Sequence, residues 1–144
     1  RPLDWEAIDR SLKIMQEGSD VMIVEGVGGV MVPMDEKHLV VDMMGWLGLP
    51  AVVVARSGLG TINHTLMTVR ILREAGVRVA GVVVNRYPAE TPGVAEETSP
   101  REIEKFGKVK VLCVVPEVKE VGGVRLSGDV VGAMDLVDWG GVGE

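Results

Sequence analysis

Four short apolar runs divide the chain, and the stretches between them carry apolar residues at helical spacing. The runs do not alternate between apolar and polar residues, which is typical of parallel strands buried on both faces. They predict strands over residues 20–25, 50–56, 77–86 and 108–118. Strands that alternate with helices through short connections indicate βαβ units. The predicted class is therefore α/β, with a parallel sheet and flanking helices.

The first helix is expected before the first strand. Asp4 can cap it, and Gly18 supplies a stop signal. Its buried stripe is expected to contain Ile8, Leu12 and Met15.

Three more helices are expected between the later runs. One covers residues 36–47. The next has Thr61 as its N-cap and ends at Gly76. The last begins with a capping box over Ser99–Glu102 and ends at Gly107.

The composition fits a single globular domain of 144 residues, 47% of them hydrophobic. A net charge of −6 gives no general attraction to nucleic acid or anionic lipid. No apolar stretch approaches the roughly 18 residues of a membrane span and no signal peptide is visible, so we expect no membrane partner and a cytoplasmic protein. The single cysteine, Cys113, is expected to be a buried thiol. Residues 1–118 form the predicted α/β domain, and residues 119–144 a glycine-rich acidic tail with one short helix and a loose end.

The candidate site follows the strands, because ligands of open parallel sheets bind beyond the carboxyl ends of the strands. Glu25 ends the first run, where a carboxylate is a good ligand for Mg²⁺. The turn after it contains Gly28 and Gly29, which permit positive φ and a close approach of backbone amides to an anion. The alternative is a tight turn with a solvated glutamate.

Two further strand ends carry polar groups. Gly60, Thr61 and Asn63 begin a helix whose free amides attract carboxylate or phosphate, or which is only an ordinary capped helix start. The side-chain amide of Asn85 can pair with an adenine edge, or can bond its own backbone in a turn. No Ser/His/Asp arrangement or Cys/His metal spacing occurs, so no catalytic side chain is predicted.

Five segments occur in a specific order: "VEGVGGVMVP", "GLGTINHTLMTVRILREAG", "VAGVVVNR", "ETSPREIEKF" and "VKVLCVVPEV". In that order and spacing they resemble dethiobiotin synthetase, a biotin-pathway enzyme family with a P-loop NTPase-like fold. The resemblance runs from Arg1 to about Val118, and "GTINHT" is its most specific part.

The resemblance implies roles for particular residues. The implied substrate-binding residues are Gly28, Gly29, Gly60, Thr61 and Asn63, of which the last three reach across a homodimer interface to the substrate's carboxylate. The implied nucleotide-binding residues are Glu25, Asn85, Arg86, Pro116 and Glu117. Glu25 also helps to hold Mg²⁺ in this interpretation, and Asn85 recognises adenine.

The reaction implied by the resemblance is an ATP-dependent ring closure. CO₂, in equilibrium with bicarbonate, carbamylates one amine of 7,8-diaminononanoate, and ATP phosphorylates the carbamate. The second amine then displaces phosphate to give a cyclic urea. This chemistry depends on alignment and charge stabilisation more than on a protein nucleophile.

The chain departs from the family pattern in one respect, because no G-x-x-x-x-G-K-[ST] phosphate loop occurs in it. It resembles the C-terminal part of the enzyme, with the first strand and the phosphate loop absent. We expect no turnover by the chain alone, a need for the upstream P-loop half, and exposed neighbours of the missing strand. The alternatives are a cobyrinate synthase-like P-loop domain, against which "GTINHT" argues, and a non-catalytic binding or regulatory remnant.

Overall fold

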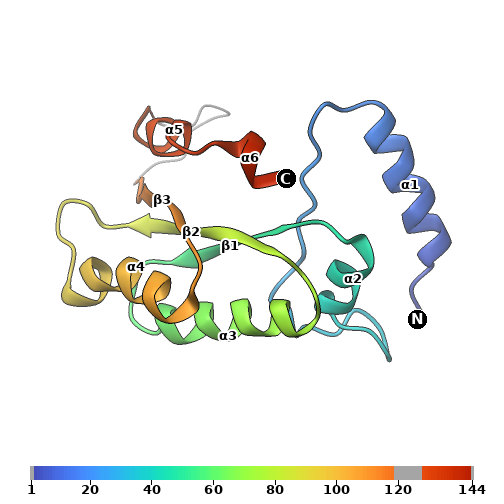
Figure 1. The fold of residues 1–144 in the computed structure, drawn as a ribbon, viewed down its shortest axis with the longest axis horizontal. Helices are drawn as coiled ribbons and strands as arrows, with labels where there is room; N and C mark the ends of the chain where they lie inside the picture. The colour runs from blue at the N-terminus through green and yellow to red at the C-terminus, as the bar shows by residue number, and fades with distance from the viewer. Residues whose placement is uncertain (1, 119–127, 144) are drawn as a thin grey trace.

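A computed structural model describes residues 2–118 and 128–143 (Figure 1). In chain order the elements are α1 (Trp5–Glu17), α2 (Val40–Leu47), β1 (Ala51–Arg56), α3 (Thr61–Glu74), β2 (Val79–Tyr87), α4 (Val94–Gly107), β3 (Val111–Pro116), α5 (Gly128–Asp135) and α6 (Trp139–Gly143). Residues 119–127 of the predicted tail lie outside the described residues.

The three strands form one parallel sheet in the order β1-β2-β3. Helices lie on both of its faces, with α3 and α4 on one side and α5 and α6 on the other (Figure 1). Continuous apolar runs suit this arrangement because both faces of each strand need cover. The predicted α/β class is confirmed.

The core divides between the two faces of the sheet. Under α3 and α4, a buried cluster contains Ala55, Val69, Val82, Val84, Ile103 and Val109. On the opposite face, Val83 packs with Cys113, Val115 and Val130. Val83 lies between Val82 and Val84 in β2, so the alternation of side chains along a strand sends neighbouring valines into different clusters. The contact of Val130 in α5 also shows that part of the predicted tail packs onto the sheet.

A third cluster lies at the amino ends of the strands. It contains Val41, Ala51, Leu72 and Val77, with the half-buried Val30 packed against it. Ala51 begins β1 and Val77 just precedes β2, so this cluster fixes α2 at the end of the sheet that is opposite the strand tips.

The strand predicted over residues 20–25 is wrong. These residues form no strand, and Val21 and Ile23 are 80% and 89% exposed. An extended segment becomes a strand only when a neighbour supplies hydrogen bonds to its backbone, and no described segment does so. The apolar pattern therefore indicates a segment that is suited to a strand, but it does not show whether the segment has a neighbour to pair with.

The first helix has the predicted ends but not the predicted buried stripe. Asp4 caps α1 by accepting a hydrogen bond from the Ala7 amide, and Gly18 follows its last residue. However, no residue of α1 is buried. The helix extends away from the sheet (Figure 1) and lies beside α2, where Trp5 contacts Trp46. Ile8 and Leu12 are therefore only half-buried, and Met15 is exposed.

Three predicted helix starts need correction. The second helix begins at Val40, because the carboxylate of Asp35 binds the amides of residues 37 and 38 and holds the chain in a turn before it. The third has Gly60 as its N-cap, with φ 90°, and Thr61 is its first helical residue. The capping box at Ser99 does not form, because α4 already begins at Val94.

In α4 the first turn is closed by a different pair of residues. The side chain of Glu96 accepts a hydrogen bond from the Gly93 amide at 3.0 Å. Pro100 then lies inside the helix, where it cannot donate a backbone hydrogen bond. The helix nevertheless continues to Gly107, because Ile103 is fully buried against the sheet.

Candidate functional site

The tips of the three strands meet at one edge of the sheet. The register of the parallel ladders places Arg56 of β1 opposite Asn85 of β2, and Tyr87 of β2 opposite Pro116 of β3. The backbone amide of Glu117 then donates to the carbonyl of Tyr87 at 2.8 Å. This group of residues is called the strand-tip edge below. It brings together the predicted residues Asn85, Arg86, Pro116 and Glu117.

Two buried serines tie the strand-tip edge together. The Ser57 hydroxyl donates to the Arg86 carbonyl at 2.6 Å, and the Ser99 hydroxyl donates to the Ser57 carbonyl at 3.3 Å. Sequence reasoning missed both as site residues. The sequence gives only a weak signal for them as site residues. Ser57 directly follows a predicted strand, and Ser99 was predicted as a helix cap.

Asn85 lies two residues before the end of β2, where the pairing with β3 is irregular. Its side-chain oxygen accepts a hydrogen bond from the Arg86 amide at 2.8 Å, and Arg86 has a positive φ of 59°. Non-glycine residues rarely adopt this conformation. The predicted alternative for Asn85, a bond to its own backbone, is therefore present. An amide oxygen has two lone pairs and the side chain keeps its NH₂ donors, so recognition of an adenine edge stays chemically open.

The start of α3 provides a second group of polar atoms. Gly60 adopts the left-handed conformation that turns the chain into the helix, and Asn63 is exposed in the first turn. Thr61 is buried, and its hydroxyl lies 3.5 Å from that of Thr65. Ile62 and Asn63 lie in the first turn of α3, where backbone amides have no acceptor within the helix. This end of α3 can therefore bind an anion. The side chain of Thr61 is buried, so it packs inside the protein more than it serves as a ligand.

Glu25 and the glycine turn are not brought to the strand-tip edge. The carbonyls of Val30 and Val32 accept the amides of Val41 and Val40 at 2.9 and 3.0 Å, so this loop runs along the start of α2. That helix lies at the amino ends of the strands. The predicted meeting of Glu25 with Asn85 does not occur here, because no strand over residues 20–25 carries the loop to the other end of the sheet.

The two glycines of this turn differ. Gly28 has a φ of 81°, and a Cβ built on it would lie 2.9 Å from a methyl carbon of Val32. A Cβ on Gly29 meets nothing within 4 Å. Positive φ is thus required at Gly28 only.

The described residues do not form a metal site by themselves. No group of three or more His, Cys, Asp or Glu side chains lies close enough to hold a metal ion in residues 2–118 and 128–143. Glu25 is an exposed single carboxylate. A magnesium ion usually keeps several waters and one or two carboxylates alongside the phosphates of its substrate, so Glu25 alone does not provide a fit for Mg²⁺.

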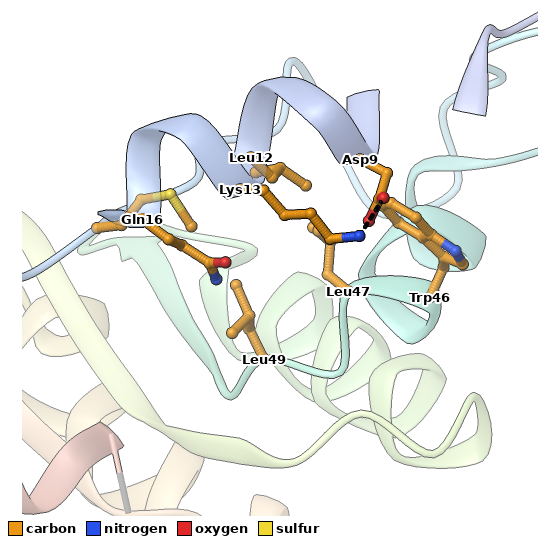
Figure 2. Close-up of a pocket in the computed structure, with 8 residues that line it drawn as sticks. Asp9, Leu12, Lys13, Gln16, Trp46, Leu47 and Leu49 are labelled. Atoms are coloured by element: carbon orange, nitrogen blue, oxygen red, sulfur yellow. Dashed lines mark hydrogen bonds and ion pairs between the residues drawn. The ribbon is translucent and has the colours of Figure 1, made fainter. Parts of the chain in front are cut away.

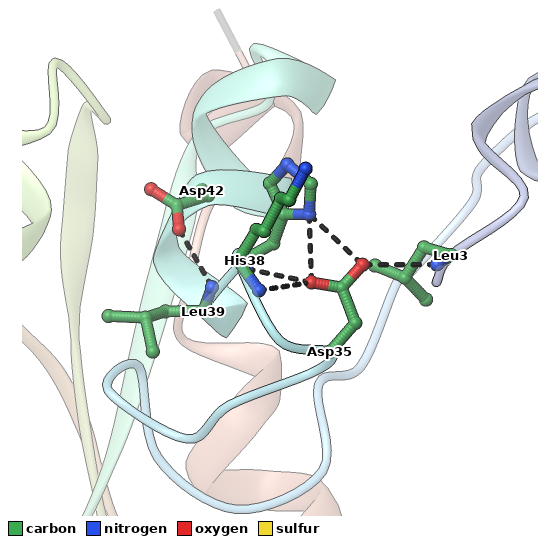
Figure 3. A network of polar contacts seen from close by, with 6 residues as sticks. Leu3, Asp35, His38, Leu39 and Asp42 are labelled. Carbon is green, nitrogen blue, oxygen red and sulfur yellow. Dashed lines mark hydrogen bonds and ion pairs between the residues drawn. The ribbon is translucent and has the colours of Figure 1, made fainter. Parts of the chain in front are cut away.

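The carboxylate of Asp35 accepts several hydrogen bonds in the loop before α2 (Figure 3). It accepts the amides of Leu3, Lys37 and His38 at 2.8–3.0 Å, and the ring Nδ1 of His38 lies 2.9 Å away. The bond from the Leu3 amide, followed by those from Lys37 and His38, holds the pKa of Asp35 well below its usual range. The bond from Leu3 links the start of α1 to the loop before α2, and Trp5 stacks edge-on against His38.

Two shallow cavities lie on the surface of the described residues. One of about 150 Å³ lies between α1 and the end of α2 and contains the Asp9–Lys13 ion pair (Figure 2). Another of about 160 Å³ lies between β1 and α3, beside Thr61, Thr65 and His64. None of the helices in the described part is long and apolar enough to cross a membrane.

Comparison with known proteins gives a consistent result. The family described as AAA domain matches residues 3–125. The ATP-dependent dethiobiotin synthetase of Bacillus licheniformis is 40% identical over 114 residues, covering 79% of this chain and 48% of the relative. Those of Paramagnetospirillum magneticum and Methanocaldococcus jannaschii are 47% and 43% identical over 107 and 110 residues, covering 74% and 76% of this chain and 49% and 51% of the relatives. The chain thus spans about half the length of these relatives.

Proposed function

Since the chain belongs to the AAA-domain family, we propose that it forms one part of an ATP-dependent dethiobiotin synthetase. The observation that carries the proposal is its 40–47% identity to several enzymes of that name. In the proposed reaction, CO₂ carbamylates one amine of 7,8-diaminononanoate and ATP phosphorylates the carbamate. The second amine then displaces phosphate and closes the cyclic urea.

The roles proposed for this chain are binding and alignment. The amides at the start of α3, near Asn63, bind the carboxylate of the substrate, because a helix N-terminus attracts anions. Asn85, presented at the tip of β2, recognises the adenine of ATP. Arg86, Pro116 and Glu117 border the nucleotide. The proximity of these groups on one sheet edge supports the assignment.

The chain alone is not expected to turn over. Its 144 residues contain no G-x-x-x-x-G-K-[ST] loop, so no lysine is placed to neutralise the phosphates of ATP. In the proposed enzyme Mg²⁺ binds together with ATP. Glu25 contacts this ion only if residues 20–25 move to the strand-tip edge. We therefore propose that a segment with the phosphate loop completes the enzyme, whether it belongs to the same polypeptide or to a separate one.

The test is a mass-spectrometric assay for dethiobiotin from 7,8-diaminononanoate, bicarbonate and MgATP. The chain is assayed alone and after co-expression with the half of the Bacillus licheniformis relative that it does not match. Product only from the co-expressed pair is the expected result. Product from the chain alone would contradict the need for a phosphate loop. A stable pair without product would contradict the enzymatic proposal.

A second candidate function is a non-catalytic binding module of the same fold. The placement of the glycine loop against α2, away from Asn85, favours it. The two candidates differ in a simple measurement. A binding module retains the diamine, measured by calorimetry, but gives no product with the complementary half.

A further inference from the structure

The end of β2 contains a β-bulge on the side that faces β3. Val84 and Tyr87 of β2 are three positions apart, whereas their partners in β3, Val114 and Pro116, are two positions apart. The extra residue of β2 falls at positions 85–86. Bulges are common next to functional sites, where they change the direction of a side chain.

The bulge contains a backbone conformation that needs support from its surroundings. Arg86 has a φ of 59°, in the left-handed region where glycine is the usual residue. Such a conformation persists in a residue with a Cβ only where neighbouring groups hold it. The side chain of Asn85 supplies one of these groups, because its oxygen accepts the Arg86 amide at 2.8 Å. This bond holds the peptide plane before Arg86.

Ser57 holds the peptide plane on the other side of Arg86. Its hydroxyl donates to the Arg86 carbonyl at 2.6 Å, and the residue is 5% exposed, so water does not compete readily for the bond. Both peptide planes that flank Arg86 are thus fixed by hydrogen bonds. The residue cannot return to an ordinary negative φ without breaking one of them.

Ser99 connects this support to α4. Its hydroxyl donates to the Ser57 carbonyl at 3.3 Å, and the residue is 1% exposed. The first turn of α4 packs against the same segment, since a Cβ built on Gly58 would lie 3.6 Å from a carboxylate oxygen of Glu96. Ser57 is therefore held by a helix that is itself packed on the sheet.

The bond from Arg86 also determines what the side chain of Asn85 can offer a ligand. Its oxygen is engaged by the Arg86 amide, whereas its NH₂ group is not used in this bond and keeps two donors. Asn85 is half-buried, so a ligand can reach it. A donor whose direction is fixed in advance loses less freedom when it binds the ring nitrogen of a purine.

We propose that Ser57 and Ser99 are positioning residues for the purine base, and that they act through Arg86 on the side chain of Asn85. This inference rests on the proposed function, from which it takes Asn85 as the group that binds adenine. Neither hydroxyl contacts the nucleotide. Their two bonds hold the bulge of β2, and the bulge holds the amide of Asn85 in the direction that the base requires.

The first experiment titrates the full chain with adenosine and follows the side-chain NH₂ signal of Asn85 by nuclear magnetic resonance. We expect Ser57→Ala to bind adenosine about fivefold more weakly than the wild type, the factor that one hydrogen bond accounts for. Ser99→Ala should give a smaller loss, because its bond is longer. Ser11→Ala, which removes an exposed hydroxyl bond in α1, is the matched control and should change nothing.

The second experiment separates positioning from a purely structural role. In the enzyme completed with a phosphate-loop segment, Ser57→Ala should raise the KM for ATP and leave kcat and the KM for the diamine unchanged. A structural role would instead lower kcat, since a smaller fraction of the protein would be folded. Circular dichroism checks the fold of each variant, and Ser99→Ala carries both experiments if Ser57→Ala does not fold.

The outcomes distinguish this inference from the proposed function. An Asn85 signal that adenosine does not shift, equal adenosine affinity of Ser57→Ala, Ser99→Ala and the wild type, or a lowered kcat with an unchanged KM for ATP would each overturn the inference. Dethiobiotin formation together with any of these results would leave the proposed function standing. Weaker adenosine binding by the serine variants, in a completed protein that forms no product, would retain the positioning role and remove the proposed function.

Discussion

The hydroxyl of Ser57 is expected to stabilise the strand-tip edge by a measurable amount. It is 5% exposed and donates to the Arg86 carbonyl at 2.6 Å. Ser57→Ala removes one hydrogen bond, with a net value of about 1 kcal/mol, and leaves a part-buried carbonyl without its donor. The expected loss is about 1–2 kcal/mol in the free energy of unfolding. Because Arg86 has a strained φ, the loss should also loosen the end of β2 that contains Asn85.

A matched control is available in α1. The hydroxyl of Ser11 also donates to a backbone carbonyl, that of Ala7 at 2.8 Å, but Ser11 is exposed. Water replaces such a bond at little cost, so Ser11→Ala should change the free energy of unfolding by less than about 0.5 kcal/mol. Urea denaturation followed by circular dichroism measures both variants. Equal effects of the two substitutions would refute the reasoning, because they would show that burial of the Ser57 bond has no consequence.

Three further predictions concern other parts of the chain. The lowered pKa of Asp35 means that its contribution to stability is present above the unfolded pKa of about 4 and is lost as pH falls through the folded pKa. Tryptophan fluorescence, to which Trp5 and its neighbour Trp46 contribute, should report release of α1 in strong acid. Asp35→Asn should release α1 at neutral pH. Gly28→Ala should destabilise the chain by about 1–2 kcal/mol because of its positive φ and the clash with Val32, whereas Gly29→Ala should be neutral in the same urea titration. Burial raises the pKa of the Cys113 thiol, so its reaction with a disulfide reagent at pH 8 should be much slower in the folded chain than in urea; equal rates would contradict the packing of α5 over it.

The strands were predictable from the sequence where their neighbours are present. The apolar runs that became β1, β2 and β3 carry the same pattern as residues 20–25, and only the latter failed. The difference is not in the residues, because a strand is completed by hydrogen bonds from another segment. The spacing of apolar residues indicates which faces of a segment can be buried. Strand pairing depends on whether another segment lies beside its backbone.

Helix ends were predictable where one side chain decides them. Asp4 caps α1 as expected because its acceptor is two to three residues from the free amides. The predicted capping box at Ser99 does not form, because an earlier cap begins the same helix. In that cap the side chain of Glu96 accepts a hydrogen bond from the Gly93 amide. The buried position of Ser99 against Ser57 is a tertiary contact, and no local pattern indicates it.

The candidate site was predictable in part for a similar reason. The residues at the tips of paired strands, such as Asn85 and Pro116, were identified because the topology of a parallel sheet gathers strand ends. The serines that hold these ends together were missed. Their role depends on distances across 29 and 42 positions of the chain, which spacing alone does not contain.

The bond from the Leu3 amide to Asp35 joins residues 32 positions apart and so closes a loop that contains residues 20–25. The ends of a closed loop are already held together, so part of the chain entropy that would be lost on ordering its middle has already been lost. Residues 20–25 are therefore presented as a tethered segment rather than a free terminus. The polar contact around Asp35 thereby restricts residues that it does not touch, and a variant that opens the loop should let residues 20–25 sample a wider range of positions.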